Sequence, residues 1–184
     1  MGLDPITFYS AIQSKGLSRD FLFRVTNITL PPNVNITEGS GLIYARAASY
    51  PGRIIEDMVV NSYGQEYHLG GRALYLNAAN YRIEFYVPGD FKLRELLESA
   101  SRAAHDKGKG VGDVGAGQTG SIGLKGLKGP AGQETGPITL EGAQIRTIGE
   151  INYLIADGIG EVVSFEVTFA YQKYTTDQQS IGFG

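Results

Sequence analysis

The sequence contains no cysteine and no tryptophan, and only two of its 184 residues are histidines, His68 and His105. Without cysteine the chain can form no disulfide and has no thiol nucleophile. A zinc site would then depend largely on carboxylate ligands, and no spacing of histidines and carboxylates indicates one. We therefore expect no metal and no other cofactor, and we interpret both histidines as surface or partly buried residues.

Long apolar runs and a strong net charge are also missing. No stretch is long and apolar enough to span a bilayer, and Met1 to Pro5 do not begin a signal peptide. The net charge of −3 and the pI near 5.4 argue against a dedicated nucleic-acid binder, which usually carries a basic face. We expect a chain with no membrane anchor and no residues that bind DNA specifically.

Motifs for catalysis are absent as well. The sequence has neither a Gly-x-Ser-x-Gly elbow nor a phosphate-binding loop of the Walker type. Two carboxylates act as acid and base only at a defined separation in a cleft, and nothing in the sequence indicates a cleft. Solvated faces explain the carboxylate groupings, which are Glu56 with Asp57, Glu95 with Glu98, and Glu161 with Glu166. We expect no enzyme activity and no catalytic residues.

What the chain does have is alternation of apolar and polar residues. Residues 160–174 place one apolar set on a single face of a strand, and residues 80–87 do the same. These sets are Val163, Phe165, Val167, Phe169 and Tyr171, and Tyr81, Ile83, Phe85 and Val87. Eleven tyrosines are also typical of a β-rich protein. Further strands are expected over 20–28, 42–48, 53–63 with an interruption at 56–57, 65–69, 73–76 and within 137–148.

Two helices are expected. Asp90 is a suitable cap for a helix that continues to Ala104, with apolar residues three and four positions apart. Asp4 and Pro5 favour a second, short helix within an N-terminal arm over residues 1–19.

Residues 108–136 are rich in glycine and lack aromatic residues, so we expect residues 105–137 to form a flexible insertion loop. Five basic and two acidic residues give 102–133 a charge of +3, so the rest of the chain carries −6. Glycine at every third position from 117 to 132 imitates collagen. The few triplets and a single proline favour a surface loop that orders against a neighbouring subunit.

Taken in order, these elements resemble the tail tube proteins of contractile-tailed bacteriophages, a superfamily that includes type VI secretion tubes. The resemblance lies in residues 21–25, in Ala45 to Arg53 with its Pro-Gly turn, in the strand-then-helix step 80–104, and in the ending from Ile148 through Phe169. It covers most of 20–100 and 140–174. The insert 105–137 is longer and richer in glycine than that family needs.

The resemblance implies a mainly β fold, with two packed antiparallel sheets in a sandwich or barrel and a flanking helix. It implies hexameric rings that stack into a hollow tube, enclosed by a sheath and joined to a baseplate, through which DNA passes without specific binding. The protein would be assembled in the host cytoplasm and reside in the virion tail. The residues themselves do not indicate which carboxylates face the channel.

The resulting domain scheme has an arm at 1–19, a tube domain at 20–174 containing the insert 105–137, and a tail at 175–184. The arm and the insert are expected to make contacts between rings, so that deletion of 108–136 would give rings that stack poorly. The alternatives are a baseplate or terminator ring, a secretion or pyocin-like tube, and a ligand-binding β-sandwich with a collagen-like segment.

Overall fold

The computed structural model describes residues 23–31, 34–37, 41–104, 120–128, 133–153 and 162–176. Its elements are β1 (Phe23–Leu30), β2 (Val34–Thr37), the 3-10 helix η2 (Leu42–Tyr44), β3 (Ala45–Ala48), β4 (Arg53–Ser62), β5 (Gln65–Tyr75), β6 (Tyr81–Tyr86), α2 (Lys92–Ala104), β7 (Gly120–Lys128), β8 (Gln133–Ile148), β9 (Ser164–Ala170) and β10 (Lys173–Thr176).

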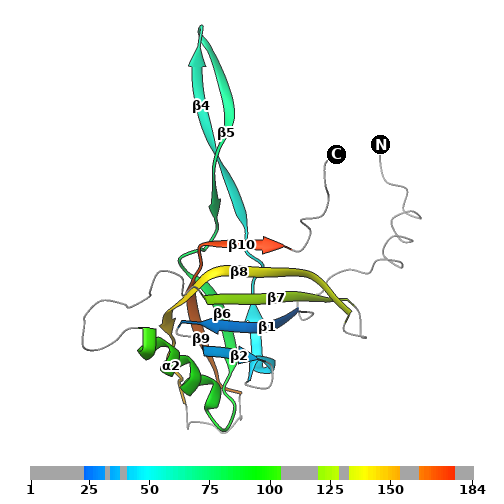
Figure 1. Cartoon of the computed structure of the whole chain (residues 1–184), viewed down its shortest axis with the longest axis vertical. Coiled ribbons are helices and arrows are strands. Elements are labelled where there is room, and N and C mark those ends of the chain that lie inside the picture. The colour runs from blue at the N-terminus through cyan, green and yellow to red at the C-terminus, as the bar shows by residue number, and fades with distance from the viewer. Residues whose placement is uncertain are drawn as a thin grey trace.

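The strands of the body form an eight-stranded antiparallel sheet in the order β2-β1-β7-β8-β9-β6-β3, with β10 also beside β8. The long strand β8 belongs to both layers of a sandwich. Its first half pairs with β7 and β10, and its second half pairs with β9. Within the described residues the sheet does not close into a barrel. The expected mainly β fold with packed antiparallel sheets and a flanking helix is confirmed (Figure 1).

The core lies between the two layers and beneath α2. Every side chain in it that is buried is apolar or aromatic, and one cluster includes Ile28, Ile122 and Leu140 from one layer and Ile83 and Val167 from the other. The alternation predicted for the last strand and for 80–87 is confirmed by burial of Phe165, Val167, Phe169 and Tyr171, and of Tyr81, Ile83 and Phe85.

Helix α2 closes one end of the core, as its sequence period predicted. Leu93, Leu97 and Ala100 are buried on its inner side. The N-cap position itself is taken by Phe91, whose φ is 55° and whose carbonyl accepts from the Glu95 amide at 3.1 Å, so the expected cap residue is wrong by one position. Asp90, one residue earlier, still accepts a hydrogen bond from the Lys92 amide at 3.3 Å.

The prediction of a flexible loop over 105–137 is wrong for the part that the structure describes. Strand β7 lies in the middle of the sheet between β1 and β8, and β8 begins at Gln133. The glycines serve close packing here. A Cβ added at Gly120 would lie 2.4 Å and 2.5 Å from the carbonyl oxygens of Ala143 and Thr29. Deletion of 108–136 would therefore remove a central strand instead of a surface arm.

Other parts of the domain scheme fall outside the described residues, namely the arm 1–19 and residues 105–119, 129–132 and 177–184. One boundary needs correction, because Thr175 and Thr176 pair with β8 as part of β10 and do not begin a tail.

Candidate functional site

A hairpin of β4 and β5 projects from the body of the molecule (Figure 1). Its two strands pair with each other from Arg53 opposite Tyr75 to Ser62 opposite Gln65, and they form a separate two-stranded sheet. An isolated two-stranded ribbon is marginally stable in water. A ribbon of this length is therefore expected to need more support than the described residues supply.

The hairpin exposes many large apolar side chains. Exposed fractions between 38% and 60% are found for Ile54, Ile55, Met58, Val59, Val60, Tyr67, Leu69 and Leu74. Contiguous apolar surface of this kind marks interaction sites in soluble proteins, whereas scattered single residues do not. The hairpin is the candidate functional site of this chain.

The outer half of the hairpin has two different faces. Cross-strand pairs Met58–Leu69 and Val60–Tyr67 put four apolar side chains on one face. The alternate pairs are Asp57–Gly70, Val59–His68 and Asn61–Glu66, which make the other face mostly polar.

His68 organises this polar face. Its Nδ1 contacts the carboxylate of Asp57, and its Nε2 lies 3.7 Å from Glu66. The interruption predicted at Glu56 and Asp57 is a β-bulge that separates this outer half from the base. At the bulge Arg72 Nε donates to Glu56 at 2.6 Å, and this hydrogen bond lowers the pKa of the Glu56 carboxyl.

The tip of the hairpin is a two-residue turn in which both central residues have positive φ, 52° at Tyr63 and 76° at Gly64. This is the pattern of a type I′ turn, which favours Asn-Gly. The left-handed conformation costs a residue with a Cβ about 1–2 kcal/mol. Tyr63 is nevertheless fully exposed, and no other described residue shields its ring. The tip therefore holds a large amphipathic side chain on a residue whose left-handed backbone conformation is unfavourable for it.

A tyrosine cluster holds the base of the hairpin. Tyr75, at the end of β5, packs against Tyr174 and Tyr171 with ring centroids 5.2 Å and 6.4 Å apart. The Tyr171 hydroxyl donates to the carbonyl of Leu76 at 2.9 Å, and the Leu76 amide donates to Gly52 at 2.9 Å. The two ends of the hairpin are thus tied to each other and to the body.

Tyr81 extends this cluster into the core. Its ring meets that of Tyr171 edge-on at 5.8 Å, and its hydroxyl donates to the carbonyl of Ser49 at 2.6 Å. Burial raises the pKa of the Tyr81 phenol, so it remains a neutral donor. The hairpin therefore leaves the body from a rigid base, which fixes the direction in which it points.

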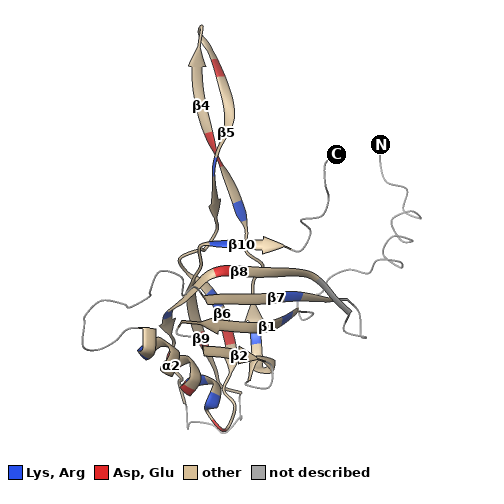
Figure 2. Ribbon diagram, in the orientation of Figure 1, with Lys and Arg blue, Asp and Glu red and all other residues tan. Residues whose placement is uncertain are grey.

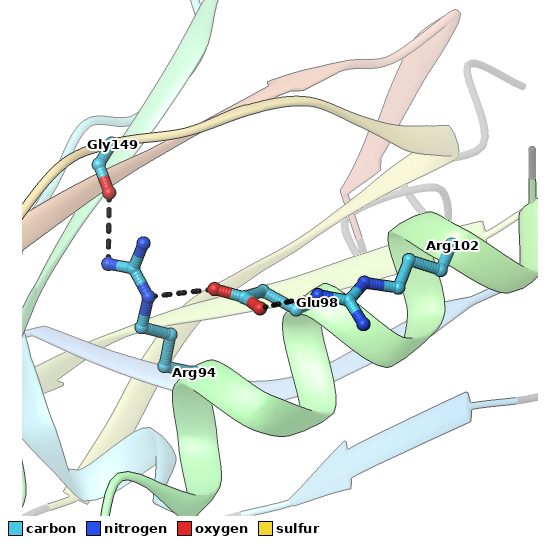
Figure 3. A network of polar contacts seen from close by, with 4 residues as sticks. All are labelled: Arg94, Glu98, Arg102 and Gly149. Atoms are coloured by element: carbon cyan, nitrogen blue, oxygen red, sulfur yellow. Dashed lines mark hydrogen bonds and ion pairs between the residues drawn. The ribbon is translucent and has the colours of Figure 1, made fainter.

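Two of the carboxylates singled out in the sequence, Glu98 and Glu166, have partners in the body of the molecule. Glu98 accepts from Arg94 at 2.9 Å and from Arg102 at 3.3 Å, and Arg94 also donates to the carbonyl of Gly149 at 3.0 Å (Figure 3). This network ties α2 to the end of β8. Glu166 lies 3.5 Å from Arg82.

The remaining candidates do not assemble into a site. His105 and Glu161 lie outside the described residues, and Glu56, Asp57 and His68 all belong to the hairpin. No group of three or more potential metal ligands occurs in the part of the chain that the structure describes. In that same part no helix has the length and apolarity to cross a bilayer.

Comparison by sequence matches no protein-family model and no curated protein. Comparison of structures finds a chain of the anti-feeding prophage baseplate, with a TM-score of 0.58 and 15% identity over 87% of this chain and 95% of that one. A chain of an extracellular contractile injection system, in a PVC sheath–tube complex, has a TM-score of 0.51 and 10% identity over 91% of this chain and 95% of that one. A chain of a PVC sheath/tube terminator has a TM-score of 0.53 and 9% identity over 86% of this chain and 94% of that one.

The chain has the fold of contractile-system tube proteins. This fold is the one that the resemblance implied, and that prediction is confirmed. The intersubunit contacts expected on the arm and the insert stay a prediction, and the sequence did not single out the hairpin as an exposed apolar surface. The sequence does contain a sign of a hairpin here, because Tyr63-Gly64 is a possible two-residue turn with apolar residues on both sides of it.

Proposed function

We propose that this chain is the repeating structural subunit of a tube, which forms hexameric rings that stack head to tail into a hollow conduit. The observation that carries the proposal is the apolar hairpin, held by a rigid base and pointing away from the body (Figure 1). A surface that is apolar on one copy and projects beyond it is suited to bury itself against another copy. The fold shared with chains of contractile systems supports the same function.

The proposal includes the setting in which the tube works. The conduit belongs to a contractile phage tail, is surrounded by a sheath and joined to a baseplate, and carries DNA during ejection. The −6 charge outside residues 102–133 is favourable for DNA that must slide without binding, since acidic surface repels phosphate. In this function the chain performs no catalysis. It is assembled in the host cytoplasm and ends in the tail of the virion.

A related ring component is the second candidate. The similar chains come from a baseplate and a sheath/tube terminator as well as from a sheath–tube complex. A terminator or baseplate ring closes after one layer, whereas a tube subunit adds rings without limit. Tubes of a type VI or pyocin-like particle would stack in the same way.

Electron microscopy of the purified protein in negative stain tests the proposal. We expect hollow tubes with sixfold end views. The double variant Val60→Thr/Leu69→Thr places a β-branched residue that suits a strand at both positions, and it replaces exposed apolar surface by hydroxyl groups. It is expected to give single rings or free subunits at concentrations where the wild type forms tubes.

The matched control is Val162→Thr, because Val162 is 69% exposed and lies outside the hairpin. This variant is expected to form tubes like the wild type. Monomers of the wild type at high concentration would refute the proposal, and rings that never stack would favour the terminator.

A further inference from the structure

Four tyrosine rings form a chain that runs from the surface at the base of the hairpin into the core. Between ring centroids, Tyr174 of β10 lies 5.2 Å from Tyr75 of β5, and Tyr75 lies 6.4 Å from Tyr171. Tyr171 lies 5.8 Å from Tyr81. Aromatic rings in such contact exchange an electron rapidly, so an oxidising equivalent that reaches one of these rings is shared among all four.

Tyrosine is the side chain of this protein that a one-electron oxidant attacks. The sequence has no cysteine and no tryptophan, the other residues that easily lose a single electron. Methionine reacts instead with oxidants such as peroxide, which add an oxygen atom to its sulfur. The cluster gathers four of the eleven tyrosines, so one-electron oxidation is directed to it.

The buried end of the chain of rings retains its phenolic protons. An oxidised phenol is a strong acid, and it becomes a lasting radical only when it loses its proton. The hydroxyls of Tyr81 and Tyr171 donate to the carbonyls of Ser49 and Leu76, and a carbonyl oxygen is a very weak base. Burial also raises the pKa of both phenols. The radical therefore does not remain on these two rings.

The surface end of the chain of rings can release its protons. Tyr75 and Tyr174 are only partly buried. Neither hydroxyl has a hydrogen-bond partner among the described residues, where no buried polar side-chain atom lacks one, so both hydroxyls reach solvent. The residue before Tyr174, Lys173, forms an ion pair with Glu141 of β8 at 2.9 Å, which holds β10 in place (Figure 2). Radicals therefore settle on two rings that already touch.

We propose that Tyr75 and Tyr174 form an oxidative cross-linking site, at which a one-electron oxidant joins the base of the hairpin covalently to β10. Each phenol gives one electron to the oxidant and one proton to water. The two phenoxyl radicals combine through ring carbons next to the hydroxyl-bearing carbons, and the hydrogens on the joined carbons then move to the phenolic oxygens. The product is dityrosine, which has one new carbon–carbon bond and two hydrogen atoms fewer than the starting pair.

The cross-link closes a long loop, because Tyr75 and Tyr174 are separated by most of the strands of the body. Closure of a long loop lowers the entropy of the unfolded chain. The cross-linked subunit is therefore expected to unfold at a higher temperature than the unmodified one. The bond forms within one copy, so the site does not depend on the proposed function.

Photo-oxidation of the full chain, at a concentration below the threshold for assembly, tests the site. The oxidant is a tris-bipyridyl ruthenium complex under visible light, and a cobalt(III) ammine complex is the final acceptor of each electron. We expect a monomeric product with dityrosine fluorescence and a mass lower by two hydrogen atoms. After digestion with trypsin, peptide 73–82 should be joined through Tyr75 to peptide 174–184, whose only tyrosine is Tyr174.

The buried pair of Tyr81 and Tyr171 is a matched control within the same molecule. Its rings are also edge-to-face, and they are only slightly farther apart than those of the surface pair. A bond between them would join peptide 73–82 to peptide 147–173. We expect this product to be absent, because the two hydroxyls retain their protons.

Three phenylalanine variants complete the test. Tyr75→Phe and Tyr174→Phe keep the packing of the rings, and each is expected to abolish the monomeric cross-linked product. Tyr153→Phe removes a phenol from a residue that is 61% exposed and is expected to leave the yield unchanged.

Several outcomes would overturn this inference. These are a wild type that gives no monomeric product, equal yields from the wild type and Tyr174→Phe, and a main product that contains peptide 147–173. An equal yield from protein unfolded in guanidinium would show that the folded geometry has no part in the reaction, and would also overturn it. Failure to form rings or tubes would refute the proposed function and leave the cross-linking site intact.

Discussion

Replacement of Gly120 by alanine should destabilise the protein far more than the same replacement at another strand glycine. Gly120 begins β7 between β1 and β8. A Cβ there would lie 2.4 Å from the Ala143 oxygen and 2.5 Å from the Thr29 oxygen. Both atoms belong to the backbones of neighbouring strands, so relief requires the strands to move apart.

The magnitude follows from these contacts. Overpacking that shifts side chains or backbone costs roughly 1–3 kcal/mol, and movement of two strands belongs at the upper end. A domain of this length loses about 2–4 °C of Tm per kcal/mol, so we expect Gly120→Ala to lower Tm by about 4–12 °C.

Gly70→Ala is the matched control. Gly70 is also in a strand, and its added Cβ would meet only the Ile55 Cγ2 at 3.6 Å, an ordinary contact. Alanine in a strand interior is generally better than glycine by roughly 0.5–1 kcal/mol, so this variant should be neutral or slightly stabilised.

The assay is thermal unfolding of both variants by circular dichroism, at a protein concentration below the threshold for assembly. Equal Tm values for Gly120→Ala and Gly70→Ala would refute the reasoning, since the close approach of β1 and β8 would then not constrain position 120. A large loss in both variants would equally contradict it.

Three further predictions concern the base of the hairpin, the helix and the response to acid. Tyr171→Phe removes the donor to the Leu76 carbonyl and should lower the free energy of unfolding by about 1 kcal/mol in urea titrations. Arg94→Met keeps much of the side-chain volume but loses the charged hydrogen bond to Gly149, and should cost about 1.5–3 kcal/mol, whereas Arg102→Met should change stability little. For Glu141, a hydrogen bond from the β10 lysine, then one from a β10 threonine, lowers the carboxyl pKa below its ordinary value of 4.5. Because the folded-state pKa is depressed, this contribution is present above pH 4.5 and is lost as pH falls through the lower value, so Glu141→Gln should show a smaller loss of stability in that acidic range than the wild type.

Strands β6 and β9 and helix α2 could be predicted from the sequence because each has one buried face. Apolar residues alternate in β6 and β9 and recur at three and four positions in α2. These periods follow from the geometry of a strand or a helix with one buried face, whatever element covers that face. The interruption at Glu56 was also visible, since charged residues break the apolar pattern where the bulge lies.

The position of β7 could not be predicted, because a stretch so rich in glycine favours a flexible loop when only neighbouring residues are considered. Close approach of Ala143 and Thr29 explains Gly120, and the side chains of Thr26 and Asn27 leave no space for a Cβ at Gly123. These reasons lie in strands distant along the chain. The exposure of the hairpin was missed for a related reason, since apolar residues in a strand predict burial and do not show that the strand projects from the body.

The separation of the hairpin from the sandwich also affects the order of folding. Strands β4 and β5 are adjacent in the chain and need only a two-residue turn to pair, so they form by local contacts. The body is different, because β6 pairs with β9, which ends at Ala170, and the central strand β7 pairs with β8. Nearly the whole chain must be synthesised before the sandwich is complete.

During synthesis the apolar hairpin is therefore complete in sequence before the body. Exposed apolar ribbons on unfinished chains are prone to aggregate. Strands β1 and β3 gain their partners β7 and β6 later, so the surfaces of the body are complete only after most of the chain has been synthesised. In the proposed tube, the subunit that assembles would therefore be the one whose body is already complete.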